Sequence, residues 1–213
     1  MHAIASINLP NYQDLADLTD QTKREYCDRY GYKFFVLKEN KYSDIMGFNK
    51  IGFMLDLLNT NPEIDWLLLS ECDATITNLT IPMDDKTDND YHVIIPVDRL
   101  NLNAGNILVR NTTEGRGYLQ MIMDSEPEYR EAGWAEQQVM IDTIDNFTDI
   151  VKIVPQRYMN SYIQAPYDYC DVRTDVLGNS GEWQVGDWIL HLPGLHKPVR
   201  IDVTKEILNH ITR

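Results

Sequence analysis

Within the first 70 residues, three short apolar runs alternate with two stretches of helical periodicity, and this alternation limits the fold more than any other feature. The apolar runs cover residues 3–7, 33–37 and 65–70, and the helical stretches cover residues 13–30 and 47–59. Short runs that are apolar throughout are typical of strands buried on both faces of a parallel sheet. The order β-α-β-α-β therefore predicts an α/β protein with a mostly parallel central sheet flanked by helices.

The rest of the chain contains shorter segments. We expect further strands at 91–97, 106–110, 150–155 and 188–192. We expect helices at 115–123, 135–145 and 204–212. The 213 residues show no internal repeat, low-complexity tract or obvious linker, so we interpret residues 1–213 as a single domain with a buried core.

Net charge limits the partners of the protein. The formal net charge is −14, and no cluster of Lys and Arg offsets it. Such a surface repels nucleic acid and anionic membranes, so we expect no nucleic-acid partner. An anionic substrate would require positive charge gathered locally, from a metal ion or from a few placed cations.

Cysteine content and the N-terminus indicate the compartment. The three cysteines are an odd number without CxxC or zinc-type spacing, which favours reduced thiols. The N-terminus MHAIASINLP lacks the basic and apolar regions of a signal peptide. No apolar run approaches the about 20 residues that span a bilayer. We therefore expect a cytoplasmic, monomeric protein without a membrane span.

Two acidic residues follow the apolar run at 65–70. Glu71 and Asp73 flank Cys72 in the stretch SECDA, at the end of the third predicted strand. Ligands of open α/β sheets bind at the carboxyl ends of strands. On extended backbone, residues i and i+2 face the same side, so both carboxylates could hold one metal ion while Cys72 points away and is buried. The stretch alone is equally compatible with a solvated junction between a strand and a turn.

A second group of polar residues lies near the C-terminus, in HLPGLHK. His191 is a candidate third metal ligand, although a lone His at a strand end is more often a structural hydrogen-bonding residue. Gly194 and Lys197 follow at a spacing that lets a loop present a backbone N–H and an ammonium to a phosphate. The three residues together indicate a ligand site more specifically than any one of them.

The stretch HLPGLHKP resembles the His-x-x-Gly-x-x-Lys-Pro motif of the family 8 retaining glycosyltransferases, the glycogenin-like group. Other stretches are more similar to family 34, the galactosyl-, mannosyl- and xylosyltransferases. These stretches, in chain order, are YCDRYGY (26–32), FNKIGFMLDLL (48–58), WLLLSECDATITN (66–78), LNAGNILVRN (102–111), EQQVM (136–140) and VPQRYMNSY (154–162). The matches keep the order of the family from about residue 22 to residue 198, so they cover most of the chain.

The resemblance implies the GT-A fold, in which a Rossmann-like nucleotide-binding half continues into a half that binds the donor sugar and the acceptor. The halves would cover about residues 1–100 and 101–213. It also implies a divalent ion, Mn²⁺ with Mg²⁺ as the alternative, held by Asp73 and His191 together with the diphosphate of a UDP-sugar. Glu71 occupies the first acidic position and would touch the metal or the ribose.

The resemblance assigns further residues to the donor site. Gly194 and Lys197 would hold the diphosphate, and Lys50 would approach the donor beside the acidic pair. The sugar pocket and the region near the anomeric carbon would contain Asn103, Ala104, Gly105, Glu136 and Gln137. Tyr12 would stack on uracil, with Ser6 or Ile7 at the edge of the base.

Two departures from the family pattern affect the expected chemistry. The first acid is Glu71, one methylene longer than the usual Asp, and Gln138 stands where many relatives carry Asp. Retaining hydrolases use a carboxylate nucleophile, whereas the residue expected at the free face of the sugar, Gln137, is an amide. We therefore expect front-face attack by the acceptor hydroxyl with the leaving phosphate as base.

Three functions remain open from the sequence. The first is a metal-dependent retaining glycosyltransferase that moves a sugar from a UDP-sugar to a glycan or glycoprotein. The second is a catalytically weak module that binds nucleotide sugars, and the third is a metal-dependent hydrolase of nucleotide sugars. A compact chain without an anchor also resembles glycosyltransferases encoded by large algal viruses or bacteria, which act in the cytoplasm.

Overall fold

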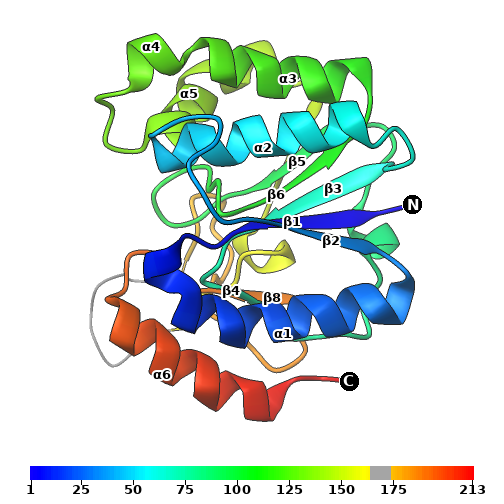
Figure 1. The fold of residues 1–213 in the computed structure, drawn as a ribbon, viewed down its shortest axis with the longest axis vertical. Coiled ribbons are helices and arrows are strands. Elements are labelled where there is room, and N and C mark those ends of the chain that lie inside the picture. Colours follow the sequence, from blue (N-terminus) through cyan, green and yellow to red (C-terminus); the bar gives the residue numbers. More distant parts are fainter. Residues whose placement is uncertain (164–173) are drawn as a thin grey trace.

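The computed structural model describes residues 1–163 and 174–213, and Figure 1 shows it as a three-layer arrangement with a central sheet. Six strands form this sheet in the order β2-β1-β3-β6-β5-β7. Their bounds are β1 Ala3–Ile7, β2 Lys33–Leu37, β3 Trp66–Ser70, β5 Val93–Pro96, β6 Asn106–Arg110 and β7 Val151–Val154. Within the described ranges, β6 is the one strand of this sheet that runs antiparallel to its neighbours. The predicted mostly parallel α/β sheet is confirmed.

Helices cover both faces of the sheet. They are α1 Gln13–Tyr30, α2 Met46–Thr60, α3 Thr113–Asp124, α4 Glu126–Tyr129, α5 Ala135–Thr143 and α6 Lys197–Ile207. In Figure 1, α2 and α3 lie above the sheet with α4 and α5, whereas α1 and α6 lie side by side below it. Among the described residues, no helix combines the length and the apolar character that crossing a membrane requires.

The apolar strands are buried on both sides. In β3, Leu67 and Leu69 pack into the core beneath α2 and α3, while Trp66 and Leu68 pack into the core on the side of α1. Because successive side chains of a strand point to opposite faces, a strand between two helical layers is apolar at most of its positions. This explains why residues 65–70 show no alternation of polar and apolar side chains.

A small second sheet lies below the main sheet. It pairs β4 (Ala74–Ile76) with β8 (Ile189–His191) in antiparallel register, so that Ala74 lies opposite His191. This pairing joins the segment after β3 to the C-terminal region and brings the two polar motifs of the sequence together.

The C-terminal helix begins earlier than the sequence indicated. The predicted helix at 204–212 is wrong in its bounds, because α6 runs from Lys197 to Ile207 and a 3-10 turn follows at Leu208–His210. Pro198 lies in the first turn of the helix, where its fixed φ is favourable and its missing N–H costs no hydrogen bond. The Lys-Pro pair of the C-terminal motif therefore starts a helix and is not part of a loop.

Candidate functional site

A turn presents the two acidic residues. The N–H of Ala74 donates to the carbonyl of Glu71 at 3.0 Å, and this hydrogen bond closes a turn directly after β3. The extended backbone expected at this pair is therefore wrong, and the turn aims both carboxylates at one point. Cys72 is half-buried and lines a pocket, so the expectation that it is buried on the opposite side is also wrong. Burial raises the pKa of its thiol to about 12.

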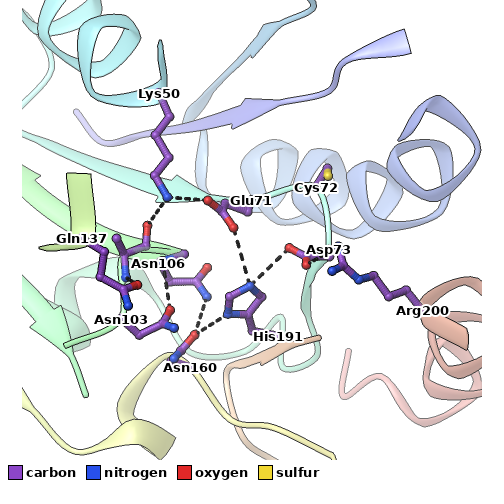
Figure 2. A network of polar contacts seen from close by, with 12 residues as sticks. Lys50, Glu71, Cys72, Asp73, Asn103, Asn106, Gln137, Asn160, His191 and Arg200 are labelled. Atoms are coloured by element: carbon purple, nitrogen blue, oxygen red, sulfur yellow. Dashed lines mark hydrogen bonds and ion pairs between the residues drawn. The ribbon is translucent and has the colours of Figure 1, made fainter. Parts of the chain in front are cut away.

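His191 completes a cluster with these acids. Its Nε2 lies 3.2 Å from Oδ1 of Asp73 and 3.7 Å from Oε2 of Glu71, as Figure 2 shows. One ligand atom from each of the three residues lies within 4.8 Å of the others. Backbone hydrogen bonds hold the arrangement, since the N–H of Leu192 donates to the carbonyl of Asp73 at 3.1 Å. The structure thus brings together the three residues expected to bind the metal.

The cluster fits a divalent cation. Oδ1 of Asp73 and Nε2 of His191 are buried, and neither has a hydrogen-bond partner in the described part of the chain. Buried polar atoms without partners are rare in folded proteins and call for a ligand, water or ion. Carboxylate and imidazole donors suit Mn²⁺, with nucleotide oxygens and water completing the shell. The residues present therefore fit the ion that the resemblance implies.

The charges of the cluster also favour a cation. Burial lowers the pKa of His191, but the negative charges of Asp73 and Glu71 outweigh burial and raise it to about 9. The imidazolium form is favoured because two carboxylates enclose the space around Nε2. A metal ion would provide positive charge in that space and leave the imidazole neutral.

Asn160 orients the imidazole. Its Oδ1 lies 2.8 Å from Nδ1 of His191, so a proton on Nδ1 leaves the lone pair of Nε2 directed at the acids. Asn106 also donates to Oδ1 of Asn160, at 3.1 Å, and fixes the amide in turn. The stretch VPQRYMNSY contains Asn160, but the sequence assigned it no role, because a bond across 31 positions leaves no local pattern.

Lys50 of α2 bridges two carboxylates, those of Glu71 and Glu136. Its Nζ donates to Oε1 of Glu71 and to the carbonyl of Ala104 at 2.9 Å, and it lies 2.7 Å from Oε1 of Glu136. Burial lowers the pKa of Lys50, but Glu136 and Glu71 outweigh burial, and the net shift is upward. Glu71 therefore uses Oε1 for Lys50 and directs Oε2 toward His191, so the longer side chain reaches both neighbours.

A pocket of about 160 Å³ opens beside the cluster. Its lining residues are Ile7, Leu9, Tyr12, Met46, Lys50, Glu71, Cys72, Asp73 and Arg200. Ile7 and Tyr12 were expected at the nucleobase, and both line the pocket together with the acids that are expected to bind the metal. Ser6 does not line this pocket, because it is buried, donates to Oδ1 of Asn8 at 3.1 Å and accepts from Lys23.

The segment expected around the sugar, residues 103–105, is held by hydrogen bonds and contacts the backbone of Glu71. Asn103 is buried, donates to Asp98 and to Tyr162, each at 2.9 Å, and accepts from the N–H of Gly105. The N–H of Ala104 donates to Oε1 of Gln137 at 3.0 Å. The carbonyl of Gly105 accepts from the N–H of Glu71.

The two residues expected near the anomeric carbon differ in environment. Gln137 is half-exposed, and its Oε1 is fixed on Ala104, so it presents its amide nitrogen. Glu136 is buried with its carboxylate on Lys50 and against Gly47. Neither residue lines the described pocket, and their catalytic roles stay predictions.

Gly194 lies just before α6, and Lys197 is the first residue of that helix. Gly194 has a φ of +72°, a conformation that favours glycine. The ammonium of Lys197 donates to the carbonyl of Asn11 at 2.9 Å and pairs with Asp14 at 3.0 Å, and it does not line the pocket. Its expected contact with a diphosphate stays a prediction.

Arg200 is the charged pocket residue that the sequence did not indicate. It lies on α6 after Lys197, and its Nη1 is 2.8 Å from Oδ2 of Asp73. With the true start of α6, the signal becomes visible, since Lys197 and Arg200 are both close to the N-terminus of a helix without an acid in its first turn. Cations are unfavourable at that end of a helix dipole, so contacts outside the helix, with Asp14 for Lys197 and with Asp73 for Arg200, account for their positions.

Comparison with solved structures identifies the fold. A glycosyltransferase involved in the glycosylation of the major capsid of PBCV-1 has a TM-score of 0.75 at 14% identity, over 96% of this chain and 98% of that chain. The galactosyltransferase LgtC, solved with donor and acceptor sugar analogs, has a TM-score of 0.59 at 14% identity, over 99% and 96%. The class is therefore defined: the chain has the GT-A fold of glycosyltransferases.

Sequence comparison then gives the family. The model of the galactosyl transferase GMA12/MNN10 family matches residues 7–87 and 81–197, more than half of the chain, so the chain belongs to this family. This confirms the resemblance to family 34. An alpha-1,2-galactosyltransferase of Schizosaccharomyces pombe is 26% identical over 218 residues, covering 82% of this chain and 54% of the relative. A probable alpha-1,2-galactosyltransferase of the same organism, gmh2, is 22% identical over 85% of this chain and 61% of the relative. The chain thus spans little more than half the length of these relatives.

Proposed function

We propose that the chain is a metal-dependent retaining glycosyltransferase that moves a sugar from a UDP-sugar to a hydroxyl of a glycan or glycoprotein. The observation that carries the proposal is the cluster of Glu71, Asp73 and His191, whose two acids line a pocket together with Tyr12. Membership of the galactosyl transferase family supports it, and the names of the relatives make UDP-galactose the first donor to test. The monomeric state and the cytoplasmic location stay predictions.

The reaction needs positive charge at the leaving group. The bond from the anomeric carbon to the diphosphate breaks, a bond to the acceptor oxygen forms, and the acceptor proton passes to the departing phosphate. Mn²⁺, or Mg²⁺ in its place, would be held by Asp73, His191 and Oε2 of Glu71 and would supply Lewis-acid stabilisation of the diphosphate. The buried ammonium of Lys50 pairs with the carboxylate of Glu71 and keeps that carboxylate ionised.

The environment of Gln137 supports front-face attack. Its Oε1 is engaged by the N–H of Ala104, so the side chain offers a nitrogen donor and no nucleophilic oxygen. The nearest acid in the chain, Glu136, is bound by Lys50 and buried. A double displacement with an enzyme carboxylate therefore lacks a nucleophile among these two residues, and retention follows from attack on the face that the diphosphate leaves.

Donor turnover tests the proposal. UDP release should be measured over a panel of UDP-sugars with Mn²⁺, with and without acceptor glycans, and the anomeric configuration of the product determined by NMR. We expect release that requires both Mn²⁺ and acceptor, and Asp73→Ala should abolish Mn²⁺-dependent UDP binding. Release that ignores acceptors would indicate a hydrolase. Mn²⁺-dependent UDP binding without turnover on any donor and acceptor would indicate a binding module.

A further inference from the structure

Arg200 occupies a position between the two ends of the pocket. Its side chain is 15% exposed, and its Nη1 lies 2.8 Å from Oδ2 of Asp73. Its Cζ lies 6.0 Å from the centroid of the Tyr12 ring, at the limit of a cation–π contact. Figure 2 shows the side chain extending from α6 toward Asp73. The guanidinium therefore lies between the residue expected at the base and a residue expected at the metal.

The pairing of the guanidinium is incomplete. A guanidinium has five N–H donors in a planar fork, and the contact with Asp73 uses those of Nη1. The Nε of Arg200 is buried and has no hydrogen-bond partner among residues 1–163 and 174–213. Asp73 also faces His191 through its other oxygen, so it cannot satisfy the whole fork. Within the described ranges, the guanidinium therefore keeps at least the Nε donor unused.

Lys197, the other cation of this helix end, is engaged elsewhere. Its ammonium donates to the carbonyl of Asn11 and to the carboxylate of Asp14. The hydrogen bond from Lys197 to Asp14 lowers the pKa of the Asp14 carboxyl. Its side chain is 37% exposed and lies outside the pocket, whereas Arg200 lines it. Of the two cations near the start of α6, Arg200 is the one that faces the ligand space.

We propose that Arg200 binds the diphosphate of the donor, using the donors that Asp73 leaves free, and that it takes the role expected of Lys197. This inference rests on the proposed function. A nucleoside diphosphate with its base on Tyr12 and its phosphates at Asp73 must pass the guanidinium. A planar fork suits two phosphate oxygens better than an ammonium does. Arg200 also holds Asp73 in place for the ion, so it has a positioning role in addition to this contact.

Binding measurements separate these roles. Dissociation constants for UDP and uridine should be measured by calorimetry at saturating Mn²⁺, and the affinity for Mn²⁺ alone by electron paramagnetic resonance. The variants are Arg200→Gln, Arg200→Lys, Lys197→Gln and, as a matched control, Arg213→Gln, whose arginine pairs with Glu25 outside the pocket. Melting curves show that each variant is folded, and Arg200→Lys keeps the charge if Arg200→Gln does not fold.

We expect Arg200→Gln to weaken UDP binding by roughly 10- to 100-fold and to change uridine binding by less than about twofold, since the lost bonds involve a charged group. Arg200→Lys should fall between, and Lys197→Gln and Arg213→Gln should stay close to the unaltered protein. The proposal is overturned if Lys197→Gln carries the larger loss, or if weaker binding of Mn²⁺ alone accounts for the whole effect of Arg200→Gln.

The unaltered protein keeps the two proposals distinguishable. If it binds no UDP with Mn²⁺, the proposed function fails, and the role of Arg200 fails with it. If it binds UDP with Mn²⁺ while both Arg200 variants bind UDP equally well, the role of Arg200 alone is overturned.

Discussion

A β-carbon on Gly105 would lie 2.2 Å from Cε1 of His191, so the glycine and the imidazole pack without space between them. Gly105 follows the buried pair Asn103 and Ala104, and its carbonyl accepts the N–H of Glu71. The same backbone segment thus supports one expected metal ligand, Glu71, through a hydrogen bond and another, His191, through close contact. A glycine is required here because any side chain would displace the imidazole.

Replacing this glycine should affect the metal more than the fold. We expect Gly105→Ala to lower Mn²⁺ affinity by at least about tenfold, because a misplaced ligand no longer meets the acids, and to destabilise the fold by about 1–3 kcal/mol. Electron paramagnetic resonance and urea unfolding give the two quantities. Gly117→Ala in α3 is the matched control, since its β-carbon would meet nothing within 4 Å. Equal Mn²⁺ affinity in the two variants would contradict the packing argument.

The extra methylene of Glu71 leads to a second prediction. Glu71 engages Lys50 with one oxygen and approaches His191 to 3.7 Å with the other. Glu71→Asp restores the acid of the family motif but shortens the reach by about 1.5 Å, the length of one C–C bond. We expect it to lower Mn²⁺ affinity by at least roughly tenfold, because a carboxylate that no longer reaches the ion is lost as a ligand, and losing even a partner that only orients a ligand has an effect of this order.

Glu63→Asp provides the control for that shortening, because Glu63 is a partly exposed acid paired with Lys33 outside the site. Calorimetric titration with Mn²⁺ compares the two variants. An affinity of Glu71→Asp equal to or higher than that of the unaltered protein would show that the reach of Glu71 is unimportant.

Asn160 gives a third prediction, on the orientation of the imidazole. Its Oδ1 is 2.8 Å from Nδ1 of His191, and removing it frees the ring to rotate and to change tautomer. We expect Asn160→Ala to reduce Mn²⁺ affinity by roughly 10- to 100-fold, whereas Asn160→Asp, which keeps an acceptor oxygen, should retain more of it. The exposed Asn209 is the control position. Similar Mn²⁺ affinities for Asn160→Ala and Asn209→Ala would contradict this role.

Much of the fold could be predicted because the strands are buried on both faces. A strand such as β3, between two helical layers, favours apolar residues, and this restriction is visible along four consecutive positions, Trp66 to Leu69. The three-residue strand β4 has no such signal, because its formation depends on pairing with β8, more than 100 positions away. The start of α6 at Lys197 was missed for a different reason, since the motif suggested a loop.

The site was predictable to the extent that its residues follow the ends of strands. Glu71, Asp73 and His191 could be identified in this way, and the structure places them together. The partners that orient them, Asn160 and Arg200, come from other segments and contact the ligands only through the tertiary fold. Their distances from His191 and Asp73 in the sequence carry no periodicity, so no local pattern could reveal them.

The ion pair between Lys50 and Glu136 gives the last prediction. Lys50 and Glu136 are 6% and 7% exposed in their side chains, and the second oxygen of Glu136 rests against Gly47, where a β-carbon would lie 1.4 Å from it. Removing the ammonium leaves the buried carboxylate of Glu136 without a cation and removes one partner of the partly exposed Glu71. We expect Lys50→Met to destabilise the fold by about 3–5 kcal/mol, because an uncompensated buried charge costs far more than the intact pair contributes.

A double-mutant cycle tests this coupling. The double variant Lys50→Met with Glu136→Gln also removes the negative charge that Lys50→Met leaves without a cation. Its loss of unfolding free energy should therefore be smaller, by about 1–3 kcal/mol, than the sum of the losses in the two single variants. Urea unfolding gives each free energy, provided that the slope with urea is unchanged. The partly exposed pair Lys33 and Glu63 is the reference, with an expected coupling below about 1 kcal/mol. A coupling at Lys50 and Glu136 no larger than that reference would contradict the argument from burial, because it would mean that solvent already screens the pair.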